Sequence, residues 1–269
     1  MPRPLGLATQ PADGVDSVRA DRDALLELLS TMPLPLWEAP SGCPGWTVKD
    51  LLAHLDAMYW RLVDRSQLPD SRGLPTERAA DRDVASRATW DPSRLLADYV
   101  EVSDRALSAL ELLRTVDDPV PLGDLGTFPA SMLADGYAFD HYIHIRADLL
   151  APRGPVDAPP PPSDELRMGP TVAWILAALP QQCAAAIAAL GGPVELVLTG
   201  PGGGHFVLHP GGQVVSGDGA RTETVASISC STPELVWWST GRATWADLEV
   251  YTAGDPVTLA VLRDRIHVF

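Results

Sequence analysis

The sequence has few cysteines and no long hydrophobic run. Its 269 residues include only Cys43, Cys183 and Cys230, an odd and widely spaced set that is not typical of a disulfide framework. No stretch approaches the ~20 uninterrupted apolar residues of a membrane-spanning helix. The N-terminal run MPRPLGLATQPADG lacks the apolar core and the cleavage site of a secretory signal. These absences predict a cytoplasmic protein with no membrane contact.

Positive charge is also scarce. The chain has 20 Lys and Arg residues against 35 Asp and Glu residues, which gives a formal net charge of −15. A nucleic-acid partner is not expected, because a phosphate backbone requires a basic surface. Lys49 is the only lysine. Since arginine, alanine and proline codons can be GC-rich and lysine codons are not, the composition indicates a GC-rich genome. The acidity also favours a monomer.

Apolar residues with helical spacing predict four helices in residues 1–150. They cover residues 15–31, 47–65, 91–114 and 129–150. Thr47 occupies the N-cap position of the second helix and Asp50 follows three positions later, a variant of the capping box. The Pro- and Gly-rich run 34–46 and the polar run 66–90 are predicted to be loops. We therefore expect an up-down four-helix bundle in this first domain.

Residues 151–163, APRGPVDAPPPPS, are predicted to form a stiff linker between two domains. The second domain, residues 164–269, is expected to be a small α+β domain of sandwich type. It combines an apolar helix interrupted or kinked at Pro180 with short antiparallel strands and two later helices. The predicted strands are 194–200, 204–210, 212–217 and 222–230, and the later helices are 232–241 and 255–266. Gly202–Gly204 is interpreted as a hairpin turn, because the Lys-Ser/Thr end of a phosphate loop is missing.

Three of the six histidines lie on two of the predicted bundle helices. Asp140 and His144 are four positions apart, so they share one helix face. His54 lies beside the apolar stripe of the second helix. Together they would form a three-ligand site of the kind that catalytic zinc requires. His141 could replace Asp140 as a ligand, and Asp148 could orient His144 or be an exposed charge at the helix end. The alternative is that these histidines are ordinary helix residues with satisfied hydrogen bonds.

Two runs resemble the mycothiol-dependent maleylpyruvate isomerase family, which belongs to the wider DinB-like group of metal-binding four-helix bundles. They are CPGWTVKDLLAHL, from Cys43 to Leu55, and FDHYIHIRADLL, from Phe139 to Leu150. A weaker match lies in WWSTGRATW and AGDPVTLAVLRDRIHVF near the C-terminus. The resemblance implies a DinB-like bundle followed by a small α/β domain.

The resemblance also implies roles for individual residues. His54 and His144 match the metal ligands, and Asp140 matches a position usually held by glutamate. Arg242 matches a cleft arginine with a catalytic and cofactor-binding role, and Trp46 is expected to bind the cofactor. A surface arginine after a helix-ending glycine is an equally good interpretation of Arg242. Two departures concern the carboxylates: Asp140 has a shorter arm than glutamate, and the aspartate that usually follows the second histidine at +3 is displaced to +4.

The function implied by the resemblance is that of an enzyme that uses a divalent metal, most simply zinc, and the thiol mycothiol. A divalent ion lowers the pKa of a coordinated thiol, and the thiolate could attack a small electrophilic substrate. Retention of the thiol gives a transferase, whereas its expulsion after bond rotation gives a cis–trans isomerase. The alternatives are a non-catalytic metal-binding regulator and a metal-dependent hydrolase without a thiol. Cys43 could be a reactive or metal-proximal thiol, but a small loop cysteine is the favoured interpretation.

Overall fold

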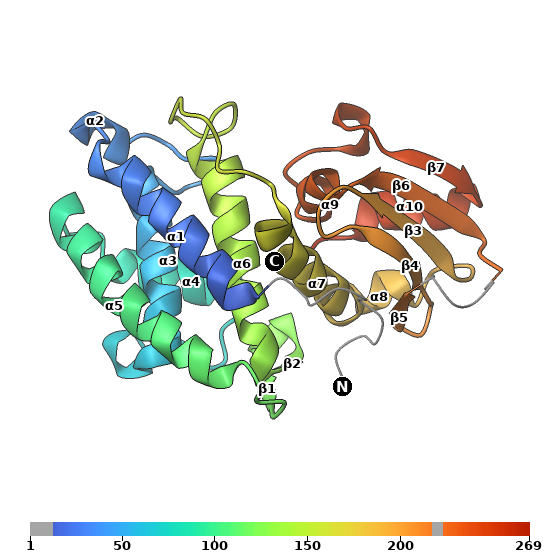
Figure 1. The fold of residues 1–269 in the computed structure, drawn as a ribbon, viewed down its shortest axis with the longest axis horizontal. Coiled ribbons are helices and arrows are strands. Elements are labelled where there is room, and N and C mark those ends of the chain that lie inside the picture. The colour runs from blue at the N-terminus through green and yellow to red at the C-terminus, as the bar shows by residue number, and fades with distance from the viewer. Residues whose placement is uncertain (1–12, 217–222) are drawn as a thin grey trace. The chain divides into compact units, whose positions relative to one another are not determined.

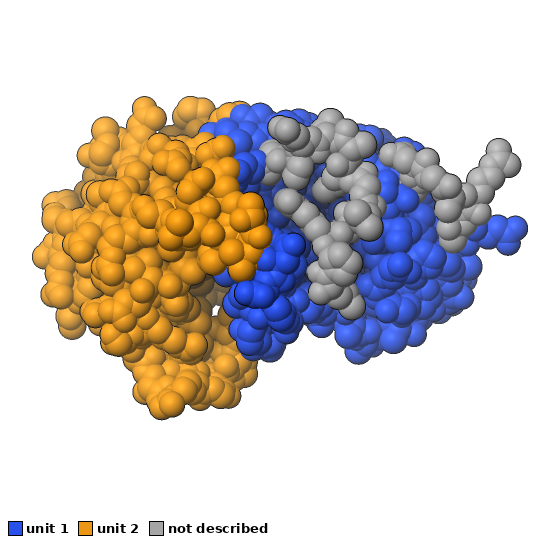
Figure 2. All heavy atoms as spheres, turned by 60° about the horizontal axis from the view of Figure 1, so that its bottom comes forward, with its two compact units in different colours: residues 1–14, 117–139, 163–269 blue, residues 15–116, 140–162 orange. Residues whose placement is uncertain are grey.

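The computed structural model describes residues 13–216 and 223–269, and within them the chain is a mixture of helices and one larger sheet (Figure 1). Contacts divide it into two compact units (Figure 2). The helical unit comprises residues 15–116 and 140–162. The sheet unit comprises residues 117–139 and 163–269 with the described residues 13 and 14. The domain limits predicted at residues 151–163 stay a prediction. The predicted strand ends at Gly217 and Thr222, and all that was expected of residues 1–12, lie outside the described residues.

Four long helical segments lie where the apolar spacing predicted them. They are α1 (Gly14–Ser30), α3 (Val48–Val63), α5 (Pro92–Leu113) and α6 (Leu133–Ile143), the last of which continues into a π-helical turn, η4 (His144–Leu149). The predicted capping box is present, since Thr47 accepts a hydrogen bond from the Asp50 amide and Asp50 accepts one from the Thr47 amide. The apolar stripe of α3 is buried through Leu51, Leu52 and Leu55.

The prediction that residues 66–90 form only a loop is wrong. They contain α4 (Thr76–Ser86), preceded by the short 3₁₀ turn η1 (Arg65–Gln67). The apolar face of α4 is narrow and made of small residues, Ala79, Ala80 and Val84, all of which are buried. An ion pair between the buried Asp83 and the partly exposed Arg61 also stabilises it, and this pair depends on a tertiary contact. A one-turn helix, α2 (Leu34–Trp37), likewise interrupts the predicted loop at 34–46.

The sheet unit contains a five-stranded sheet in the order β5-β4-β3-β6-β7. Its strands are β3 (Val194–Thr199), β4 (Gly204–Leu208), β5 (Val214–Ser216), β6 (Ala226–Ser231) and β7 (Tyr251–Gly254). Strands β3 and β4 form the predicted hairpin around the glycine turn. The expectation of a wholly antiparallel sheet is wrong, because β6 pairs with β3 in parallel. Alternating residues identify a strand, but its direction depends on the path of the chain between strands.

Among the described residues, four α-helices lie wholly in the sheet unit: α7 (Glu165–Gln182), α8 (Ala184–Ile187), α9 (Thr232–Ser239) and α10 (Pro256–Arg265). The apolar helix passes through Pro180 and ends two residues later, so the predicted interruption lies slightly further along the chain. A hairpin of β1 (Pro119–Pro121) and β2 (Thr127–Pro129) precedes α6, with Phe128 stacked on Trp174 at a centroid distance of 4.3 Å. Within the described ranges, no helix combines the length and the apolar character needed to cross a membrane.

Candidate metal centre

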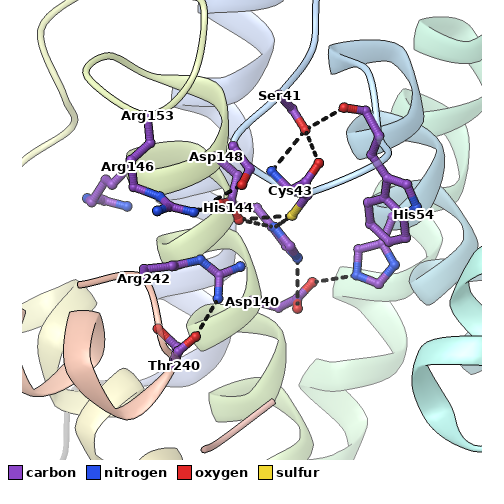
Figure 3. A network of polar contacts seen from close by, with 12 residues as sticks. Ser41, Cys43, His54, Asp140, His144, Arg146, Asp148, Arg153, Thr240 and Arg242 are labelled. Carbon is purple, nitrogen blue, oxygen red and sulfur yellow. Dashed lines mark hydrogen bonds and ion pairs between the residues drawn. The ribbon is translucent and has the colours of Figure 1, made fainter. Parts of the chain in front are cut away.

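Three side chains of the helical unit converge on one point (Figure 3). His54 comes from α3, Asp140 from α6, and His144 is the first residue of the π-helical turn. His54 Nε2 lies 3.4 Å from Asp140 Oδ2, and His144 Nε2 lies 3.4 Å from Asp140 Oδ1. One ligand atom from each residue lies within 4.8 Å of the other two. We call these three residues the ligand cluster.

The ligand cluster fits a divalent cation. Charge-assisted N–H···O bonds are usually about 2.7 to 2.9 Å long, so the two 3.4 Å contacts are long for such bonds. Asp140 Oδ2 is buried, and the long contact with His54 Nε2 satisfies it only weakly, which is costly for a carboxylate oxygen unless another positive group binds it. Two imidazole nitrogens and one carboxylate oxygen are a ligand set of catalytic zinc sites. The shorter arm of aspartate therefore still reaches both imidazoles.

The three groups also couple electrostatically. Burial alone would raise the pKa of Asp140, but the positive charges of His144 and His54, together with their hydrogen bonds, hold that pKa well below its usual value. Burial alone would lower the pKa of His144, but the Asp140 charge and hydrogen bonds to Asp140, Asp148 and Cys43 raise it well above its usual value. Without a metal ion, protons therefore supply the positive charge that the buried carboxylate requires.

Asp148 fixes the orientation of His144. Its carboxylate is buried, and Oδ2 accepts a hydrogen bond from His144 Nδ1 at 2.9 Å. A carboxylate only accepts, so Nδ1 carries a proton, and loss of the second proton from Nε2, on the Asp140 side, would free a lone pair there for a cation. The π-helical turn His144–Leu149 brings the two residues together, and such turns are frequent at functional sites. The carboxylate displaced to +4 thus still contacts the imidazole.

Comparison with known proteins covers the residues of this site. Residues 18–149 match the family model described as mycothiol maleylpyruvate isomerase N-terminal domain. This part of the chain belongs to that family. The matched residues include the whole ligand cluster and Asp148, so the mycothiol maleylpyruvate isomerase N-terminal domain contains every residue of the candidate centre. No curated protein matches the sequence.

Two solved structures share the fold. They are a mycothiol-dependent maleylpyruvate isomerase and a variant of it in which a histidine is replaced by alanine. Each is similar at a TM-score of 0.56 with 17% sequence identity, over 92% of this chain and 95% of the other. The likeness extends past the mycothiol maleylpyruvate isomerase N-terminal domain to the sheet unit, and at this identity it concerns the fold alone.

Cys43 of the same family domain lies directly beside this centre. Its thiol donates to Asp148 Oδ2 at 3.2 Å and lies 3.7 Å from His144 Nδ1 (Figure 3). Cys43, His144 and Asp148 form a second group of potential ligands that shares one imidazole with the ligand cluster. Of the interpretations of Cys43, the structure supports the metal-proximal one. No local pattern indicates this, since Cys43 is 101 positions before His144.

Of two other predicted residues, one lies beside the ligand cluster and the other does not. Trp46 lies beside the ligand cluster, with its ring centroid 5.1 Å from that of His54. His141 does not join the cluster; it is buried, and its Nε2 lies 3.0 Å from the hydroxyl oxygens of both Tyr59 and Tyr99. His141 therefore connects α6 with α3 and α5 within the family domain.

The remaining predicted site residue belongs to the sheet unit. Arg242 follows Gly241, whose φ of 68° lies in the left-handed region that favours glycine, just after α9 ends. Its Nη1 donates to the Thr240 carbonyl oxygen at 3.4 Å. The role of Arg242 in catalysis or cofactor binding stays a prediction.

Proposed function

We propose that the chain is a metal-dependent enzyme that uses a low-molecular-weight thiol, mycothiol, to isomerise or modify a small electrophilic substrate. The observation that carries this proposal is the convergence of His54, Asp140 and His144 around a buried carboxylate oxygen whose contact with His54 Nε2 is long, at 3.4 Å. The names of the family and of the two similar structures support a thiol-dependent isomerase. We also propose that α1, α3, α5 and α6 form an up-down four-helix bundle around this centre.

His54 Nε2, one carboxylate oxygen of Asp140 and His144 Nε2 would hold the ion. A divalent ion at this position would lower the pKa of a bound thiol and supply a nucleophile near neutral pH. Asp148 keeps the His144 proton on Nδ1, so that the opposite nitrogen remains a ligand. The indole of Trp46 covers His54 and offers an apolar surface to a thiol or an unsaturated substrate.

Metal content and thiol dependence test the proposal together. Purified protein is expected to contain about one zinc or other divalent ion per chain, and His54→Ala and His144→Ala are expected to lose it. Metal-loaded protein with mycothiol is then expected to convert maleylpyruvate or a related unsaturated acid, and chelation is expected to abolish this activity. Protein without stoichiometric metal would contradict the proposal.

Two further outcomes identify the alternatives. Metal binding without thiol affinity or any turnover would indicate a regulator that acts without catalysis. Metal-dependent hydrolysis that proceeds equally well without thiol would indicate an activated-water hydrolase. A thiol requirement that follows the metal content through the His54 and His144 variants would exclude both.

A further inference from the structure

The Nδ1 side of His144 contacts a loop from a distant part of the chain, residues 41–43. The Gly42 amide donates to the Asp148 carbonyl oxygen at 2.7 Å. A Cβ atom on Gly42 would lie only 2.8 Å from both Asp148 Cα and the Ala147 carbonyl oxygen, so the two backbones are in direct contact. The Arg153 guanidinium donates to the Gly42 carbonyl oxygen at 3.0 Å. The loop is therefore fixed against the segment that carries Asp148.

This loop directs the Cys43 thiol toward the Asp148 carboxylate. Ser41 Oγ accepts a hydrogen bond from the Cys43 amide at 3.2 Å and donates one to the Trp46 carbonyl oxygen at 2.9 Å. The thiol then donates to Asp148 Oδ2, the same oxygen that accepts from His144 Nδ1. Because Asp148 is fully buried, bulk water cannot replace a donor that is removed. Two donors from different elements thus contact Oδ2 of this carboxylate, while the Arg153 guanidinium lies 3.9 Å from its Oδ1.

We propose that Cys43 is a positioning residue of the metal centre, which holds Asp148 in the orientation that His144 requires. This inference rests on the proposed function, because it assigns Cys43 a role in the same site. The thiol acts through Asp148 and is not itself a ligand. In this arrangement Oδ2 stays in line with Nδ1 because the Cys43 hydrogen bond opposes rotation of the carboxylate. His144 Nε2 is then directed at Asp140 before any ion binds.

Three variants test the positioning role. Cys43→Ala removes the donor, Cys43→Ser keeps a donor of similar size, and Cys230→Ala removes a buried thiol of β6 as the matched control. Losing a direct hydrogen-bond partner of a ligand costs about 10- to 100-fold in metal affinity. Cys43 is one hydrogen bond further from the candidate ligand His144 than Asp148 is. Cys43→Ala is therefore expected to lose roughly 3- to 10-fold in zinc affinity, measured by chelator competition. Cys43→Ser and Cys230→Ala should stay within about twofold of the unchanged protein.

Two spectroscopic measurements separate positioning from other roles. The proton resonance of His144 Nδ1–H in metal-free protein should shift in Cys43→Ala and stay in place in Cys230→Ala. Cobalt-loaded protein should show no thiolate-to-cobalt charge-transfer band in the near ultraviolet. Such a band, lost in Cys43→Ser, would overturn the proposal by making Cys43 a ligand. Unchanged zinc affinity together with an unchanged resonance in Cys43→Ala would overturn it as well.

These measurements also separate this proposal from the proposed function. If the unchanged protein binds no metal, the proposed function fails. The resonance of His144 in metal-free protein still reports whether Cys43 orients Asp148. A shift in Cys43→Ala would then support the positioning role alone, and its absence would overturn that role too.

Discussion

His144 donates from Nδ1 to Oδ2 of Asp148 over 2.9 Å, and both residues lie on a single π-helical turn. One nitrogen of the imidazole is thereby protonated and fixed, while the other lies 3.4 Å from the Asp140 carboxylate. This relationship orients His144 as a candidate metal ligand, and the following outcomes are expected if it is one.

Asp148→Asn should weaken metal binding. The amide removes the negative charge that stabilises the Nδ1 proton and can present an N–H group to it instead of an oxygen. We expect a loss of about 10- to 100-fold in zinc affinity, measured by chelator competition. Asp70→Asn, which changes an exposed aspartate paired with Arg72, is the control and should bind zinc normally. Normal affinity in Asp148→Asn would show that this carboxylate has no part in the centre.

Asp140 should be required as a carboxylate. Asp140→Asn removes the charge between the two imidazoles, and zinc content per chain, measured by elemental analysis, is expected to fall far below one. Asp140→Glu keeps the charge and adds one methylene, so it should retain most of the metal. Equal zinc content in Asp140→Asn and the unchanged protein would remove Asp140 from the ligand cluster.

Metal affinity should decrease as the pH falls. In metal-free protein the pKa of His144 is raised well above its usual value, because the attraction of Asp140 and hydrogen bonds to it, Asp148 and Cys43 outweigh burial. A proton on His144 competes with the ion for Nε2, so competition should begin at a higher pH than for an ordinary histidine, whose pKa is about 6.5. The slope of log affinity against pH, measured by competition titration, should approach one near neutral pH. A flat profile from pH 8 to 6 would contradict this expectation.

His141 should matter for stability and not for metal content. It is buried between the hydroxyl groups of Tyr59 and Tyr99, so His141→Leu removes a partner from buried polar groups. We expect the free energy of unfolding of metal-free protein, measured with denaturant, to fall by about 1 to 3 kcal/mol. Zinc stoichiometry should remain near one per chain, in contrast to His144→Ala. Loss of metal in folded His141→Leu would restore the alternative in which His141 is a ligand.

Much of the helical unit follows from short-range patterns. The capping box of Thr47 and Asp50 and the apolar stripe of α3 act within a few residues, so the sequence alone predicts where this helix begins. The i to i+4 spacing of Asp140 and His144, with a histidine on another helix, likewise predicted three side chains that the structure brings together. The family motif points to the same residues.

Other features required the tertiary structure. Helix α4 has a narrow apolar stripe of small residues, and its pairing of Asp83 with Arg61 forms only when α3 and α4 are both in place. The parallel pairing of β6 with β3 depends on the path of the chain between strands. Nothing near Cys43 in the sequence indicates that it contacts Asp148, and the direction of His141 toward two tyrosines depends on α3 and α5.

The sequence by itself determined which residues begin the helices and which types of ligand are available, because capping and periodicity act between neighbours along the chain. Only the tertiary structure decided which of these side chains face the same point and which ones orient them. Contacts between residues a hundred positions apart depend on how whole elements pack, and local patterns carry no information about that packing.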